Sequence, residues 1–119
     1  MITITTGSRY RIDKSELTKK TTDILKKLRI SLENNLNIIF VGKRKMREIA
    51  VRYKNEDVAL PVLSFSYRDL ETNFSGENTF GEIVICYPQA VLLAAQKDKT
   101  VEQILLWLIE HGLENILYK

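Results

Sequence analysis

The chain has 119 residues, of which 45% are hydrophobic and 28% are charged, a composition typical of one globular domain and not of a disordered segment. Its net charge of +3 is uneven, because residues 1–54 carry 14 lysines and arginines against 5 acids and the remainder carries 4 against 10. No stretch approaches the ~20 apolar residues of a membrane-spanning helix, and the N-terminus lacks the basic-then-apolar pattern of an export signal. We therefore expect a single domain over residues 1–119, located in the cytoplasm without membrane contact.

The first third of the chain predicts a strand, a helix and a second strand. Residues 1–6 alternate isoleucine with threonine, which is typical of a short strand. Asp13 is a suitable N-cap for a helix whose apolar stripe ends near Leu28. Residues 36–41 are apolar, β-branched and too few for a helix, so they predict an interior strand that ends at Gly42.

The middle of the chain predicts a second helix and two more strands. Residues 45–54 place apolar side chains at helical spacing and turn a basic side outward. Residues 62–65 and 82–86 are short, apolar segments that are typical of strands. The polar connection from residue 68 to residue 79 contains glycine and asparagine, and we expect it to be a mobile loop.

The last third predicts two helices and completes the fold. Pro88 suits an early helical position, so residues 89–97 predict a third helix. Thr100 and Gln103 form a capping-box pattern ahead of a broadly apolar helix, which should be the central helix of the core. Helical crossovers favour parallel strand pairs and the shorter strand-to-strand connection favours an antiparallel one. The order therefore predicts an α/β (α+β) sandwich with a four-stranded mixed sheet and about four helices.

Lysine and arginine concentrate in the second predicted helix and in the loop that enters it. A basic surface of this kind is typical of proteins that bind nucleic-acid phosphates, whereas the simpler interpretation is a solvated helix face. The candidate RNA-binding residues are Lys43, Arg44, Lys45, Arg47, Arg52 and Lys54. Tyr53, Tyr67 and Tyr87 are candidates for stacking on bases, although tyrosine beside strands more often belongs to the core.

The only histidine, His111, is the main candidate for chemistry. On a helix, His111 and Asn115 share a stripe with Ile104 and Leu108, which places two ligand-capable groups on the inward face. Such a pair can serve one metal ion, and a histidine can also accept a proton near neutral pH without a metal. Magnesium held through Asn115 and Glu114 is a further possibility. The competing interpretation is that His111 caps the C-terminus of its helix.

The single cysteine, Cys86, excludes an internal disulfide. It ends an apolar strand segment and no histidine or basic run adjoins it in sequence. We therefore expect a buried small hydrophobe and not a reactive thiol.

Two segments together resemble the YbeY family, bacterial rRNA maturation factors described as metal-dependent endoribonucleases. Residues 62–65, VLSF, are similar to the family's TDVLSFP segment, and residues 81–86, GEIVIC, are similar to its LGDIVIC strand. They stand at a family-like separation and precede a helix that carries His111, Gly112 and Leu113. The resemblance implies the family's fold, zinc as the usual metal, and ribosomal RNA or the small ribosomal subunit as the partner.

The family's signature, HGxLHLxGYDH, contains three metal-binding histidines. His111 matches the first, Asn115 stands at the second, and the third has no counterpart before the chain ends. Lys54 replaces an arginine proposed to act on RNA, Ala50 replaces an asparagine, and Leu60 with Pro61 replaces Thr-Asp. A catalytic zinc site needs about three protein ligands and an open position. We therefore expect zinc to be absent or weakly bound, with His111 and Asn115 as an incomplete metal pair.

Three functions compete. The first is a YbeY-type endoribonuclease in rRNA processing, in which Lys54 contacts phosphate and His111 is a metal ligand or general base. The second is an inactive module that keeps the contact with RNA or the ribosome, and the residues alone favour it. The third is a structural or regulatory protein whose basic face meets an acidic protein. A cleft lined by Lys54, Ser64 and His111 would favour the enzyme.

Overall fold

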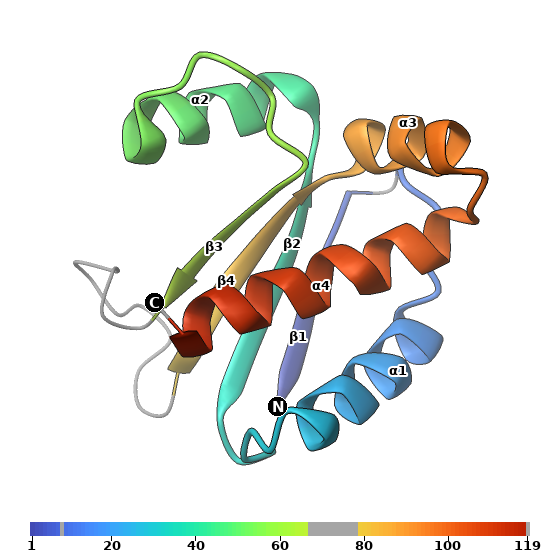
Figure 1. The fold of residues 1–119 in the computed structure, drawn as a ribbon, viewed down its shortest axis with the longest axis vertical. Helices are drawn as coiled ribbons and strands as arrows, with labels where there is room; N and C mark the ends of the chain where they lie inside the picture. The colour runs from blue at the N-terminus through green and yellow to red at the C-terminus, as the bar shows by residue number, and fades with distance from the viewer. Residues whose placement is uncertain (8, 67–78, 119) are drawn as a thin grey trace.

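The computed structural model describes residues 1–7, 9–66 and 79–118, which form four strands and four helices (Figure 1). In chain order these are β1 (Ile2–Thr5), α1 (Lys14–Lys27), β2 (Asn35–Val41), α2 (Lys43–Lys54), β3 (Val62–Ser66), β4 (Thr79–Cys86), α3 (Tyr87–Lys97) and α4 (Val101–Tyr118). The predicted order of elements is confirmed. Of the predicted mobile connection, residues 68–78 lie outside the described residues, and Thr79 already belongs to β4.

The strands form one mixed sheet in the order β1-β2-β4-β3. β2 is parallel to both β1 and β4, whereas β3 is antiparallel to β4. Ile83 of β4 is aligned with Ile38 of β2 on one side and with Ser64 of β3 on the other. This topology confirms the predicted mixed sheet, and it leaves β3 at an edge of the sheet.

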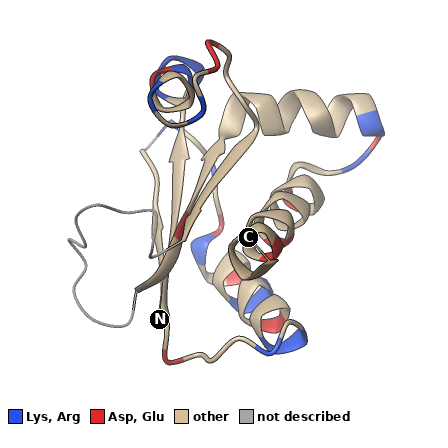
Figure 2. Ribbon diagram, turned by 60° about the vertical axis from the view of Figure 1, so that its left-hand side comes forward, with Lys and Arg blue, Asp and Glu red and all other residues tan. Residues whose placement is uncertain are grey.

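Helices cover both faces of the sheet. α1, α3 and α4 lie on one face, and α2 lies on the other (Figures 1 and 2). Successive strand residues point to opposite faces, so Ile83 and Ile85 pack into the core beneath α1 and α4, while Val84 and Cys86 pack beneath α2. The larger core therefore lies between the sheet and α1, α3 and α4, and a smaller core lies between the sheet and α2.

Local signals determine the starts of α1 and α4. Asp13 accepts a hydrogen bond from the backbone N–H of Glu16 at 3.0 Å. Both capping-box bonds are present before α4: the N–H of Gln103 donates to Thr100 Oγ1 at 3.1 Å, and the N–H of Thr100 donates to Gln103 Oε1 at 2.9 Å. α2 and α3 each begin two residues earlier than predicted, because the helix starts directly at the end of the preceding strand.

α4 is the central core helix, as predicted. It buries Ile104, Leu105, Leu108, Ile109 and Leu113 and continues to Tyr118. His111 is therefore inside the helix, and the interpretation that it caps a C-terminus is wrong. Gly112 does not end the helix either, since a Cβ there would lie 3.2 Å from the Ile83 side chain. Its missing side chain permits close packing of α4 on β4.

Cys86 is fully buried, as predicted. Burial raises the pKa of its thiol above the usual value, because a thiolate is poorly solvated in an apolar core. Within the described residues, no helix combines the length and apolar character needed to cross a membrane.

Candidate active site

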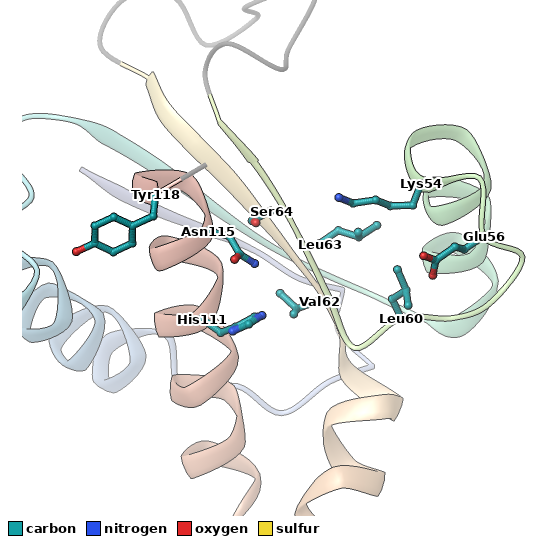
Figure 3. A pocket seen from close by; sticks show the side chains of 9 residues that line it. All are labelled: Lys54, Glu56, Leu60, Val62, Leu63, Ser64, His111, Asn115 and Tyr118. Carbon is teal, nitrogen blue, oxygen red and sulfur yellow. The ribbon is translucent and has the colours of Figure 1, made fainter.

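A cleft of about 440 Å³ opens around the edge strand β3. Three parts of the chain line it, as Figure 3 shows: the end of α2 and the loop after it, β3, and the C-terminal half of α4. The lining residues are Lys54, Glu56, Leu60, Val62, Leu63, Ser64, His111, Asn115 and Tyr118. The cleft exists because the sheet ends at β3, with α2 above one face and α4 below the other.

His111 and Asn115 face this cleft from α4, and Figure 3 shows both side chains turned toward β3. The predicted stripe on the inward face of the helix is buried only in its first part. Ile104 and Leu108 are buried, whereas His111 and Asn115 are exposed. The first residues of this stripe of α4 face the core. Its later residues face the cleft, because the C-terminal half of α4 packs against the edge strand β3. The imidazole is therefore accessible to a large substrate.

Lys54 and Glu56 face the cleft from the opposite side. Lys54 ends α2, and its side chain extends toward Ser64 in Figure 3. The helix ends at Asn55, which has a left-handed backbone with φ of 56°, a conformation that asparagine tolerates well. The N–H groups of Asn55 and Glu56 then donate to the carbonyl of Ala50. This turn holds a cation and a carboxylate on the same cleft.

Glu56 is a residue of the site that the sequence did not predict. It lies beyond the predicted helix, in a segment with no motif. The signal that was present is Asn55, because asparagine after the last turn of a helix favours a left-handed cap that redirects the chain.

The six predicted RNA-binding cations do not gather at one place. Only Lys54 lines the cleft. Lys43, Arg44 and Lys45 form the first turn of α2 and are exposed. At 1.5 Å per residue, Lys43 is about 16 Å from Lys54 along the helix axis. The basic surface therefore extends along the whole of α2.

Three cations of α2 have a neighbouring carboxylate or aromatic ring. Arg47 lies 3.8 Å from a carboxylate oxygen of Asp57, and Lys45 lies 3.9 Å from Glu48. The guanidinium of Arg52 lies 5.6 Å from the centre of the Tyr53 ring. The two ion pairs are exposed and hold their cations weakly, so a phosphate can compete for them.

The structure changes the interpretation of the charge asymmetry. Lys20 of α1 donates a hydrogen bond to Glu102 of α4, which raises the pKa of Lys20 above its usual value. Lys27 pairs with Glu110 at 3.1 Å. Basic residues of α1 are thus offset by acids from the second half of the chain. Figure 2 shows basic residues around α2, where Lys43, Arg44 and Lys45 are exposed in one turn.

The candidate stacking tyrosines have different settings. The Tyr87 ring stacks on the Tyr10 ring with centres 4.6 Å apart, and both residues pack against the main core. Tyr53 is 51% exposed on α2. Tyr67 lies outside the described residues. Of the two stacking candidates that the structure describes, Tyr53 is the exposed one.

The cleft does not offer the donors of a zinc site. In the described ranges, no three residues among His, Cys, Asp and Glu are grouped so as to hold a metal ion. The ligand-capable groups on the cleft include the His111 imidazole, the Asn115 amide and the Glu56 carboxylate. A catalytic zinc site uses about three ligands from histidine, cysteine or carboxylate side chains. This set offers one imidazole and one carboxylate beside a weakly binding amide, so we assign no chemical step to zinc.

The chain is similar in sequence to bacterial proteins named endoribonuclease YbeY. It is 35% identical over 82 residues to the one from Thermodesulfovibrio yellowstonii, which covers 69% of this chain and 50% of that protein. It is 29% identical over 105 residues to the one from Finegoldia magna, covering 82% of this chain and 67% of that protein. The match to the first of these relatives thus spans about half of its length.

The fold has a solved counterpart in a solution structure of a Thermotoga maritima protein. The TM-score is 0.59 at 24% sequence identity, and the match covers 95% of this chain and 69% of that one. This likeness supports the predicted fold class. A family model described as endoribonuclease YbeY matches residues 3–117, which is nearly the whole sequence, and the chain therefore belongs to the YbeY family.

Proposed function

We propose that this chain binds ribosomal RNA along α2 and in the cleft beside β3, and cleaves it there as a YbeY-type endoribonuclease. The observation that carries the proposal is the meeting of Lys54, Ser64 and His111 on one open cleft. A cation can stabilise charge on a phosphate, and an accessible imidazole can accept a proton; both contributions promote RNA cleavage. Such a function belongs in the cytoplasm, where ribosomes are assembled.

Two residues of the cleft have different roles in the proposed reaction. His111 accepts the proton of a ribose 2′-hydroxyl, whose oxygen attacks the adjacent phosphorus. The bond from phosphorus to the 5′-oxygen then breaks, and the leaving oxygen takes a proton from water. Lys54 stabilises the charge that develops on the phosphoryl oxygens. Lysine provides one point charge and not the paired contact of an arginine, so the hold on the phosphate is less directional.

An inactive RNA-binding module is the second candidate. The donor set of the cleft favours it, because Asn115 offers an amide where a second imidazole would be needed for zinc. Incubation of the purified chain with an end-labelled rRNA fragment separates the two candidates. Discrete products that require the protein support the enzyme, whereas binding without products supports the module.

Reversing the charge of Lys43, Arg44 and Lys45 together to glutamate is expected to weaken RNA binding steeply at low salt. These residues form the exposed first turn of α2, and fewer neutralised phosphates mean that fewer counterions are released on binding. For single-stranded RNA the slope of log K against log salt should fall in magnitude by about 2. Acids at a helix N-terminus stabilise the helix, so weaker binding would not reflect unfolding.

The matched control is the same reversal at Lys14, Lys19 and Lys26 of α1, which are exposed on the opposite side of the sheet. It changes net charge equally and should leave most of the affinity. Fluorescence anisotropy with a labelled rRNA fragment measures both triple variants. Equal losses in the two would show that RNA does not bind along α2.

Zinc occupancy of the purified protein is expected to be far below one atom per chain. His111 supplies an imidazole and Asn115 an amide, which is a weak ligand for zinc. Elemental mass spectrometry of protein prepared without chelators gives the occupancy. The Asn115→His variant places a second imidazole one helical turn from the first and should bind zinc more tightly. Tightly held stoichiometric zinc in the unmodified chain would contradict this expectation.

A further inference from the structure

A second cavity, of about 370 Å³, lies on the α2 side of the sheet. It shares no lining residue with the cleft beside β3. Its floor is apolar and formed by Ile39 and Val41 of β2 and Val84 of β4. Ile39 is aligned with Val84 across the sheet, so these side chains share one face. One stripe of α2, from Lys45 through Ile49 to Tyr53, forms the wall above this floor, because residues four apart lie on one side of a helix.

Two aromatic rings border this cavity, which we call the α2 pocket. The Tyr53 and Phe65 rings meet edge to face, with centres 5.0 Å apart and an angle of 67° between their planes. This contact helps to fix the Tyr53 ring, while 51% of the residue stays exposed. A fixed and accessible aromatic ring beside an apolar floor is the setting in which an unpaired nucleobase can stack.

The charges of the α2 pocket are divided between its rim and its floor. Lys45 and Arg52 are exposed cations on α2, two helical turns apart, and can meet phosphates at the rim, where the exposed carboxylate of Glu48 lies 3.9 Å from Lys45. Glu82 lines the pocket from β4, and its Oε1 accepts a hydrogen bond from the Asn37 side chain at 3.4 Å. This bond to the neighbouring strand anchors the carboxylate on the sheet. An anchored carboxylate favours N–H donors and disfavours a phosphate at the same place.

We propose that the α2 pocket binds one unstacked nucleobase of single-stranded RNA and prefers a base with an exocyclic amino group. The base stacks on Tyr53, its amino group donates to Glu82, and its flanking phosphates meet Lys45 and Arg52. A carboxylate is a suitable acceptor for the amino group of cytosine. The cations at the rim complement a polyanion, which favours RNA over a protein as occupant. This inference rests on the proposed function, since it supplies a second contact for the same RNA.

Cytidine and uridine hexamers provide the sharpest test, because the two bases differ in carrying an amino or a carbonyl group at one position. Fluorescence anisotropy at low salt should give tighter binding of the labelled cytidine hexamer. Tyr53→Ala should weaken that binding about tenfold because the base no longer stacks, and Tyr53→Phe should retain it. Glu82→Gln should reduce the preference for cytidine, because an amide both donates and accepts. Lys26→Ala, on the far side of the sheet, is the matched surface control.

Several outcomes would overturn the inference. Equal affinities for the two hexamers would show that Glu82 does not select the base. Unchanged affinity in a folded Tyr53→Ala variant would show that the base does not stack on Tyr53. Thermal melting shows whether Tyr53→Ala folds. If it does not, the nearly isosteric Glu82→Gln variant still tests the inference through its effect on the preference for cytidine. Cytidine monophosphate that competes as well as the hexamer would indicate a free-nucleotide site. If neither hexamer binds, the α2 pocket does not take RNA, which would contradict the inference and favour a protein as its occupant.

Different experimental outcomes would contradict the inference and the proposed function. Cleavage of the rRNA fragment that depends on His111, without any effect of Tyr53 or Glu82 on hexamer binding, would contradict only the inference. A cytidine preference that depends on Glu82, without any cleavage, would contradict only the hydrolytic part of the proposed function.

Discussion

Replacing His111 with alanine is expected to reduce the rate of rRNA cleavage by about 10²- to 10⁴-fold, the usual contribution of a general base. His111 is the only histidine in the sequence and lines the cleft opposite Lys54. Because the side chain is exposed, its removal leaves the core of α4 intact and should not change stability greatly. The initial rate on an end-labelled rRNA fragment is the measurement.

The control for this substitution is Glu114→Ala. Glu114 is an exposed residue of α4, less than one turn from His111, and it is not part of the cleft lining. Its removal should leave the rate nearly unchanged. RNA affinity should persist in His111→Ala, since Lys54 and the first turn of α2 supply the cations. A His111→Ala protein that cleaves at the original rate would eliminate the imidazole as the proton acceptor.

The order of the elements could be predicted because the relevant signals are local. The capping box of Thr100 and Gln103 and the cap at Asp13 depend on residues three positions apart, as such caps generally do. The packing of Gly112 inside α4 could not be found in this way. Gly112 favours a helix end when only its neighbours are considered, but in the structure it packs against Ile83 of a distant strand.

The candidate site was predictable where helical spacing, charge or a family motif marked a residue, and not elsewhere. His111 was found as the only histidine, on a helical stripe with Asn115, and Lys54 as one cation of a basic cluster; the family resemblance added their roles, and both residues line one cleft. Glu56 has no motif, and its place depends on the left-handed turn at Asn55. The division of the basic residues also depends on tertiary structure. Lys20 meets Glu102 across 82 positions of sequence, so a count of charges in each half could not show which cations remain available.

Replacing Gly81 with alanine is expected to destabilise the fold by about 1–3 kcal/mol, the range for overpacking in a closely packed core. A Cβ at Gly81 would lie 2.5 Å from the carbonyl oxygen of Phe65 on β3 and 2.9 Å from the Ile116 side chain of α4. The first of these neighbours is backbone and cannot rotate away. β3 must therefore shift relative to β4, and Ser64, which belongs to the cleft, must shift with it.

Urea unfolding followed by circular dichroism measures this destabilisation, and Gly7→Ala provides the matched control. A Cβ at Gly7 would have nothing within 4 Å, so the free energy of unfolding should stay within about 0.5 kcal/mol of its original value. Because alanine restricts the unfolded chain more than glycine does, any change there should be toward greater stability. Since Gly81→Ala also moves β3, the variant should cleave the rRNA fragment more slowly even at temperatures where it remains folded. A Gly81→Ala protein as stable as the original would mean that β3 and β4 are not packed this closely, and the cleft that β3 carries would then need a different geometry.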